Sequence, residues 1–72
     1  MDLEKLRSMR EKAGYSQEFI AKKLNITKST YSRKENGKLP ISLDEARVLK
    51  TVLSLSKAQI MDIFFNQKVS LK

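Results

Sequence analysis

Glycine and proline interrupt this 72-residue sequence at only three positions, Gly14, Gly37 and Pro40. Between these positions the apolar residues recur every three or four residues, which is the spacing of an amphipathic helix. No segment alternates apolar and polar residues between turn-forming residues, as a half-buried strand would. The sequence therefore predicts an all-α fold built from short helices.

We expect five helices, and each has a residue whose side-chain oxygen could cap its first turn: Asp2, Ser16, Thr27, Ser42 and Ser56. The helices would cover approximately residues 2–13, 16–24, 27–35, 42–53 and 56–64. The apolar stripes that would form the core contain Leu3, Leu6, Met9, Ala13, Ile20, Ala21, Leu24, Leu43, Ala46, Leu49, Leu53, Ile60, Ile63 and Phe64. We assign residues 1–66 to one compact domain and residues 67–72 to a frayed tail.

The charge balance and the missing residue types narrow the function. Fifteen Lys and Arg residues stand against eight Asp and Glu residues, and the net charge of +7 favours an anionic partner such as nucleic acid. Without Cys, His or a glycine-rich phosphate loop, we expect no enzyme, no metal site and no cofactor. No apolar run approaches the roughly 20 residues of a membrane span, and no signal peptide is evident, so we expect a cytoplasmic protein.

Residues 16–38 carry the functional signal. They predict two short capped helices joined by a tight turn, with the small residue Ala21 where the helices would cross. At about 100° per residue, one side of the second helix carries only short polar or cationic side chains, namely Lys28, Ser29, Ser32 and Arg33. This face suits a DNA major groove, because Lys and Arg donate to guanine and hydroxyls serve several bases.

At these residues the chain resembles the Xre/Cro/repressor helix-turn-helix family of phage and bacterial regulators. The resemblance covers roughly residues 3–65. The positions that carry it are Arg7, Arg10, Gly14, Ser16-Gln17-Glu18, Ala21, Ser29-Thr30-Tyr31-Ser32-Arg33, Glu35-Asn36-Gly37-Lys38, Ser42-Leu43-Asp44-Glu45-Ala46 and Leu53-Ser54-Leu55-Ser56. It implies a lambda-repressor-like five-helix domain, with the helix-turn-helix at the second and third helices, and a DNA-binding transcriptional regulator of the repressor type.

The resemblance also implies roles for the matching residues, with residues 27–35 as the recognition helix in the major groove. The residues that would contact bases are Gln17, Lys28, Ser29, Ser32 and Arg33. The residues that would contact phosphates are Ser16, Gln17, Thr27, Thr30, Asn36 and Lys38. Arg10 and Glu35 would form a largely buried ion pair that locks the first helix to the end of the third.

Three positions depart from the family's pattern. Lys34 replaces an apolar residue, and we expect its stem to pack while its amine reaches water or a phosphate. Asn25 replaces a common turn glycine, which is tolerable because Asn accepts positive φ. Phe19 replaces a polar residue, and two placements stay open: partial exposure, or packing against the first helix.

The sequence also suggests partners. Phe64 and Phe65 are adjacent and cannot both face the core, so we expect one of them to contact a dimer mate or another partner. We expect a homodimer on a near-palindromic double-stranded operator, with half-sites about 34 Å apart. A chain of this length leaves no room for a separate sensing domain, so control would come from a regulatory protein partner, concentration or operator competition. The alternative is an antitoxin or adaptor that uses the same fold to bind a protein through Phe19, Phe65 and the basic surface.

Overall fold

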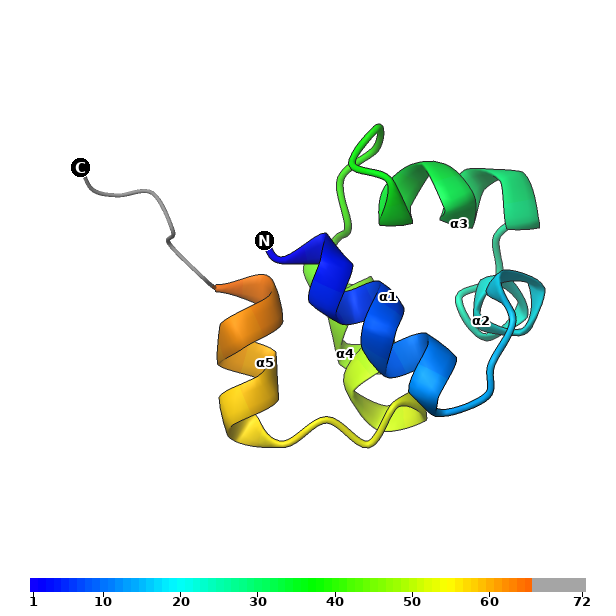
Figure 1. Cartoon of the computed structure of the whole chain (residues 1–72). Coiled ribbons are helices and arrows are strands. Elements are labelled where there is room, and N and C mark those ends of the chain that lie inside the picture. The colour runs from blue at the N-terminus through cyan, green and yellow to red at the C-terminus, as the bar shows by residue number, and fades with distance from the viewer. Residues whose placement is uncertain (66–72) are drawn as a thin grey trace.

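The structure, a computed structural model, describes residues 1–65, which form five α-helices and no strand (Figure 1). The helices are α1 (Leu3–Lys12), α2 (Gln17–Lys23), α3 (Lys28–Glu35), α4 (Leu43–Val52) and α5 (Lys57–Phe64). The expected all-α, five-helix fold is therefore confirmed. The expected domain boundary at residue 66 and the tail 67–72 lie outside the described residues.

Each helix begins at a capping residue, which explains how such short helices form. The side-chain oxygens of Asp2, Ser16, Thr27, Ser42 and Ser56 each accept the backbone N–H three residues later. In α4 and α5 the cap is reciprocal, because Glu45 and Gln59 accept the backbone N–H groups of Ser42 and Ser56. The caps satisfy N–H groups that have no partner within the helix.

The core lies where the five helices meet. Its buried members are Leu6, Ile20, Ala21, Tyr31, Leu49, Leu53, Leu55, Ile63 and Phe64. Ala21 is 1% exposed, and as a small residue it allows α2 to approach α3 closely. Asn25 adopts a φ of 59° in the turn between these helices, as its tolerance of positive φ predicts.

The expected apolar stripes are wrong at two positions. Leu43 is 69% exposed, because α4 begins beyond the edge of the core and only its later turns face inward. Ala13 is also exposed, since it is the C-cap of α1 and lies past the last turn that packs. The loop residue Leu55 is 6% exposed and fills part of the core, although no helical stripe identifies it.

The arrangement of the helices leaves one side of α3 open. Figure 1 shows α1 between α3 on one side and α5 on the other. The backbone N–H of Asp2 donates to the carbonyl of Ile63 at 2.6 Å, which fastens the start of α1 to the end of α5. The side of α3 that faces away from α1 is therefore not covered by any other described helix.

None of the helices within residues 1–65 is long and apolar enough to cross a membrane.

Candidate nucleic-acid interface

Helix α3 presents two chemically different faces. Tyr31 and Glu35, one turn apart, are each 1% exposed and point into the protein. The side chains of Lys28, Ser29 and Arg33 are exposed, and Ser32 beside them is half-buried. The helix thus brings the four predicted base-reading residues of α3 to its outer side, where they form a short polar and cationic surface.

Gln17 lies beside this surface, at the first position of α2. Its side-chain Nε2 donates to Glu35 Oε1 at 3.0 Å, so the end of α3 fixes the amide in place. An amide nitrogen has two N–H donors and its oxygen is an acceptor, so this contact leaves one donor and the oxygen for a ligand. Gln17 is half-buried and its orientation is set before any ligand arrives.

The predicted phosphate-binding residues lie at the two ends of α3 and at the start of α2. Ser16 and Thr27 are the N-caps of α2 and α3. The Thr27 hydroxyl also donates to Thr30 Oγ1 at 2.9 Å, which orients the Thr30 hydroxyl. Asn36 is the C-cap of α3, and the exposed Lys38 follows it by two residues.

Behind this surface, the Glu35 carboxylate accepts hydrogen bonds from three helices. Arg10 of α1 donates through Nε at 2.8 Å and through Nη2 at 3.1 Å, and its Nη1 donates to the carbonyl of Tyr15 at 2.7 Å. Tyr31 of α3 donates its hydroxyl at 2.7 Å. With Gln17 of α2, these donors satisfy both carboxylate oxygens. The structure therefore places Arg10 and Glu35 together, and it shows that Tyr31 and Gln17 also donate to the Glu35 carboxylate.

These contacts fix the protonation states. Burial alone raises the pKa of Glu35, but hydrogen bonds from Arg10, Tyr31 and Gln17 outweigh burial and hold that pKa below its ordinary value. Burial raises the pKa of Tyr31, and its hydrogen bond to Glu35 raises it further. At neutral pH Glu35 is therefore ionised, and Tyr31 keeps the proton that it donates.

Two contacts of Glu35, with Tyr31 and with Gln17, were not predicted from the sequence. Tyr31 precedes Glu35 by four residues, so helical spacing is a signal that could have identified their contact. Gln17 and Glu35 are 18 residues apart. Their contact depends on how α2 crosses α3, which no local pattern specifies. The hydrogen bond from Arg7 to Asn36 likewise depends on how α1 packs against α3, and no local pattern predicts it.

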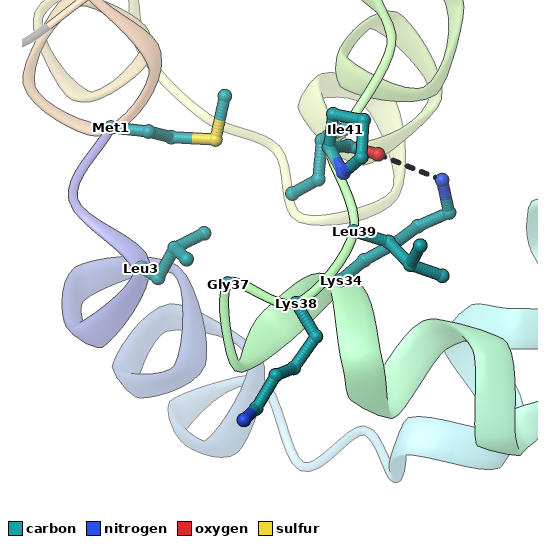
Figure 2. Close-up of a pocket in the computed structure, with 8 residues that line it drawn as sticks. Met1, Leu3, Lys34, Gly37, Lys38, Leu39 and Ile41 are labelled. Carbon is teal, nitrogen blue, oxygen red and sulfur yellow. Dashed lines mark hydrogen bonds between the residues drawn. The ribbon is translucent and has the colours of Figure 1, made fainter.

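The stem of Lys34 packs as expected, since its side chain is only 14% exposed. Its amine has two partners within the protein that the sequence did not predict. Lys34 Nζ donates to the carbonyl of Pro40 at 2.8 Å (Figure 2). It also lies 3.1 Å from Glu45 Oε1. The loop after α3 brings both acceptors to the amine. Lys34 thereby ties the end of α3 to the start of α4.

The loop that Lys34 ties down also borders an open apolar pocket (Figure 2). The residues that line this pocket are Met1, Leu3, Lys34, Gly37, Lys38, Leu39, Pro40 and Ile41. The described part of the chain contains no cluster of three or more side chains that could hold a metal ion.

The aromatic side chains are divided between the core and the surface. Phe19 is partly exposed, packs against the core and stacks on Tyr15 with a centroid distance of 4.5 Å. The Lys23 amine lies 5.1 Å from the centroid of the Phe19 ring. Phe64 is buried in the core, so of the two adjacent phenylalanines it is the one that faces inward. Phe65 is 50% exposed and is the aromatic residue at this end of α5 that a partner could reach.

Comparison with known proteins identifies this architecture. A family described as helix-turn-helix matches residues 6–60, which include both helices of the candidate interface. The chain belongs to this family. In helix-turn-helix terms, α2 is the first helix of the motif and α3 is the second.

A Pyrococcus furiosus protein, provisionally named an HTH-type transcriptional regulatory protein, is 34% identical to this helix-turn-helix chain over 64 residues. The match covers 89% of the chain and 20% of the relative, so the chain spans about one-fifth of the length of that protein. No solved structure gives a significant match. The similarity therefore concerns the helix-turn-helix domain and not the rest of the Pyrococcus protein.

Removing Arg10 should strongly destabilise the helix-turn-helix. Arg10→Met leaves the Glu35 carboxylate buried without its cation, and we expect a loss of roughly 3–5 kcal/mol in the free energy of unfolding. Lys5→Met is the control, because it breaks the exposed Lys5–Asp62 pair of the same helix and should cost less than about 1 kcal/mol. Urea unfolding followed by circular dichroism measures both. Equal losses of unfolding free energy in the two variants would show that the Glu35 network does not stabilise the fold more than a surface ion pair does.

Acid should weaken the fold through Glu35. Because its pKa is lowered in the folded state, Glu35 contributes stability that is complete above its ordinary value of 4.5 and is lost as pH falls through its folded-state value. Tyr31→Phe removes one donor and raises that folded-state pKa, so the variant should lose less stability than the wild type as pH falls below 4.5. Urea unfolding at several pH values measures this loss.

The control for the acid experiment is Glu45→Gln, because the pKa of Glu45 is also lowered. Burial by itself raises the pKa of Glu45, whereas hydrogen bonds from the Ser42 backbone and from Lys34 lower it. We expect Glu45→Gln to lose almost as much unfolding free energy in acid as the wild type does. An acid-linked loss in Tyr31→Phe that equals the wild-type loss would contradict the role of Glu35.

Proposed function

We propose that this protein binds double-stranded DNA in a sequence-specific manner and acts as a transcriptional repressor. The observation that carries the proposal is the division of α3 into a buried face, which contacts α1 and α2 through Glu35, and an exposed face of Lys28, Ser29, Ser32 and Arg33. Membership of the helix-turn-helix family supports it, as does the name of the Pyrococcus relative as a transcriptional regulator.

In this proposal α3 lies in the major groove and reads bases with its exposed face. Arg33 and Lys28 can donate to the O6 and N7 atoms of guanine, whereas Ser29 and Ser32 can accept or donate and so tolerate several bases. Gln17, held by Glu35, would contact the DNA backbone and an outer base. The rigid attachment of α3 lets these side chains arrive in a fixed geometry, which lowers the entropy lost on binding.

Contacts to phosphates would supply most of the affinity and set the register. The candidates at the ends of α3 and the start of α2 are Ser16, Thr27, Thr30, Asn36 and Lys38. The net charge of +7 strengthens the attraction to DNA and makes binding dependent on salt. Phosphate contacts carry no sequence information themselves, so specificity would rest on the exposed face of α3. Repression would follow if the bound site overlaps the sequence that a polymerase needs.

Replacing the cationic base readers should abolish specificity before it abolishes binding. Sequences selected from a random duplex pool define the site, and a scrambled duplex of equal length is the reference. We expect Arg33→Ala and Lys28→Ala each to reduce binding to the selected site by about 1–3 kcal/mol, because each loses a base contact, and to reduce scrambled-duplex binding far less. Fluorescence anisotropy titration measures both affinities.

The control for the base readers is Lys50→Ala. It lowers the net charge by the same amount, but the lysine that it removes is exposed on α4. It should leave the ratio of selected to scrambled affinity unchanged. If Arg33→Ala and Lys28→Ala fold normally and also leave that ratio unchanged, α3 is not the recognition helix. Failure to enrich any sequence would favour the second candidate function.

The second candidate is a protein-interaction module, such as an antitoxin or adaptor. The observation that favours it is the exposure of Met61 and Phe65, which are 54% and 50% exposed and lie four residues apart at the end of α5. Neighbouring apolar side chains of this size suit a protein contact. Salt separates the two functions, because DNA binding weakens by orders of magnitude at moderate salt whereas an apolar contact barely responds.

The same apolar pair suits a homodimer on a near-palindromic operator. We expect Phe65→Ser to lower the affinity for a selected symmetric site and to remove cooperativity, while leaving the affinity for a single half-site unchanged, because only the contact between protomers is lost. The control is Leu43→Ser, since Leu43 is exposed on another helix. Titration of full-site and half-site duplexes measures the effect. Cooperative binding that survives in Phe65→Ser would exclude this interface.

A further inference from the structure

We propose that Arg7 is a DNA-backbone contact, and that it forms a phosphate clamp together with Asn36. This inference rests on the proposed function and adds a binding residue from α1, outside the helix-turn-helix segment. Arg7 Nη2 donates to Asn36 Oδ1 at 3.0 Å, so the guanidinium lies at the C-terminal end of α3. The side chain is 47% exposed and can be reached from solvent.

The charge of Arg7 is not neutralised where it lies. Its nearest acid is Glu35, at 3.7 Å from Arg7 Nε, but Arg10 already holds that carboxylate at 2.8 Å. Arg7 and Arg10 thus share the Glu35 carboxylate, and the second acid of the group, Glu11, lies 3.9 Å from Arg10 Nη2. Arg7 therefore has no carboxylate of its own among residues 1–65. By contrast, Lys5 and Lys34 each lie against an acid of their own, Asp62 and Glu45.

The hydrogen bonds leave donors for an anion. A guanidinium has five N–H donors, and the side-chain hydrogen bond of Arg7 within residues 1–65 uses one of them. Because Asn36 turns its Oδ1 toward Arg7, its Nδ2 points away and lies 3.5 Å from Ser32 Oγ. Arg7 therefore orients the Asn36 amide, whose Nδ2 donates one N–H to Ser32 Oγ and keeps the other. Both side chains thus keep unused donors at the C-terminal end of α3.

The location fits a phosphate better than a base. Asn36 and the exposed Lys38 follow the last turn of α3, where the DNA backbone would pass if the outer face of α3 enters the groove. An arginine binds a phosphate through two parallel hydrogen bonds, which gives it geometry as well as charge. A phosphate at this point would receive donors from α1 and α3 and would set the angle at which α3 lies in the groove.

The test compares two cations of the same helix. Arg7→Met and Lys5→Met remove one charge each, but Arg7 binds Asn36 at the end of α3 whereas Lys5 binds Asp62 of α5. Figure 1 shows α3 and α5 on opposite sides of α1. On a scrambled duplex, Arg7→Met should bind about tenfold more weakly at low salt. The slope of log Kd against log salt concentration should fall by about one. Lys5→Met should change that slope by less than half as much.

Further variants separate contact from structure. Arg7→Lys keeps the charge, so it should retain the salt slope while recovering only part of the affinity. A merely structural Arg7 would lower the thermal midpoint and leave the slope unchanged. The clamp is overturned if Arg7→Met has the wild-type slope or the slope of Lys5→Met.

The proposed function has its own readout in the same assay. If the wild type binds no DNA, both proposals fall. If Arg33→Ala lowers the preference for the selected site while Arg7→Met keeps the wild-type slope, DNA recognition stands and only the clamp is wrong.

Discussion

The buried carboxylate of Glu35 is the interaction on which the rest of the structure depends. Removing an ionised group from water is costly, so it is tolerated only where donors replace the lost hydration. Here those donors come from Arg10 of α1, Gln17 of α2 and Tyr31 of α3. Their geometry can be satisfied only when three helices meet in one arrangement. The network therefore specifies the crossing of α2 and α3 more narrowly than apolar packing alone would.

The sequence predicts the helices well because their signals are local. Capping residues, the break at Gly14 and the turn at Asn25 act within a few residues of the chain, and the structure places helix starts where they indicate. Burial is predicted less well, since it depends on where each helix meets its neighbours. Leu43 has the spacing of a core residue but lies beyond the core, whereas Leu55 lies in a loop and is buried.

In the candidate interface, too, local features could be predicted from the sequence, whereas contacts between distant segments could not. The exposed face of α3 follows from helical geometry, and the Arg10–Glu35 pair follows from family resemblance. Lys34 could not be placed in this way, because its partners, the Pro40 carbonyl and Glu45, reach it only through the path of the following loop. Nor could the contact between Arg7 and Asn36 be foreseen, since it joins residues 29 apart. Contacts between distant segments are fixed by tertiary packing, which periodicity does not describe.

The separation of the two faces of α3 has a functional consequence. Tyr31 and Glu35 hold the helix, while Lys28, Ser29 and Arg33 make no side-chain contact that the described fold requires. Substitutions on the outer face can therefore change which bases are read at little cost in stability. Ser32 and Asn36 are different, because they connect to Arg7 and through it to α1. Base specificity can therefore vary at Lys28, Ser29 and Arg33. Ser32 and Asn36 instead help to set the angle of α3 relative to the rest of the domain.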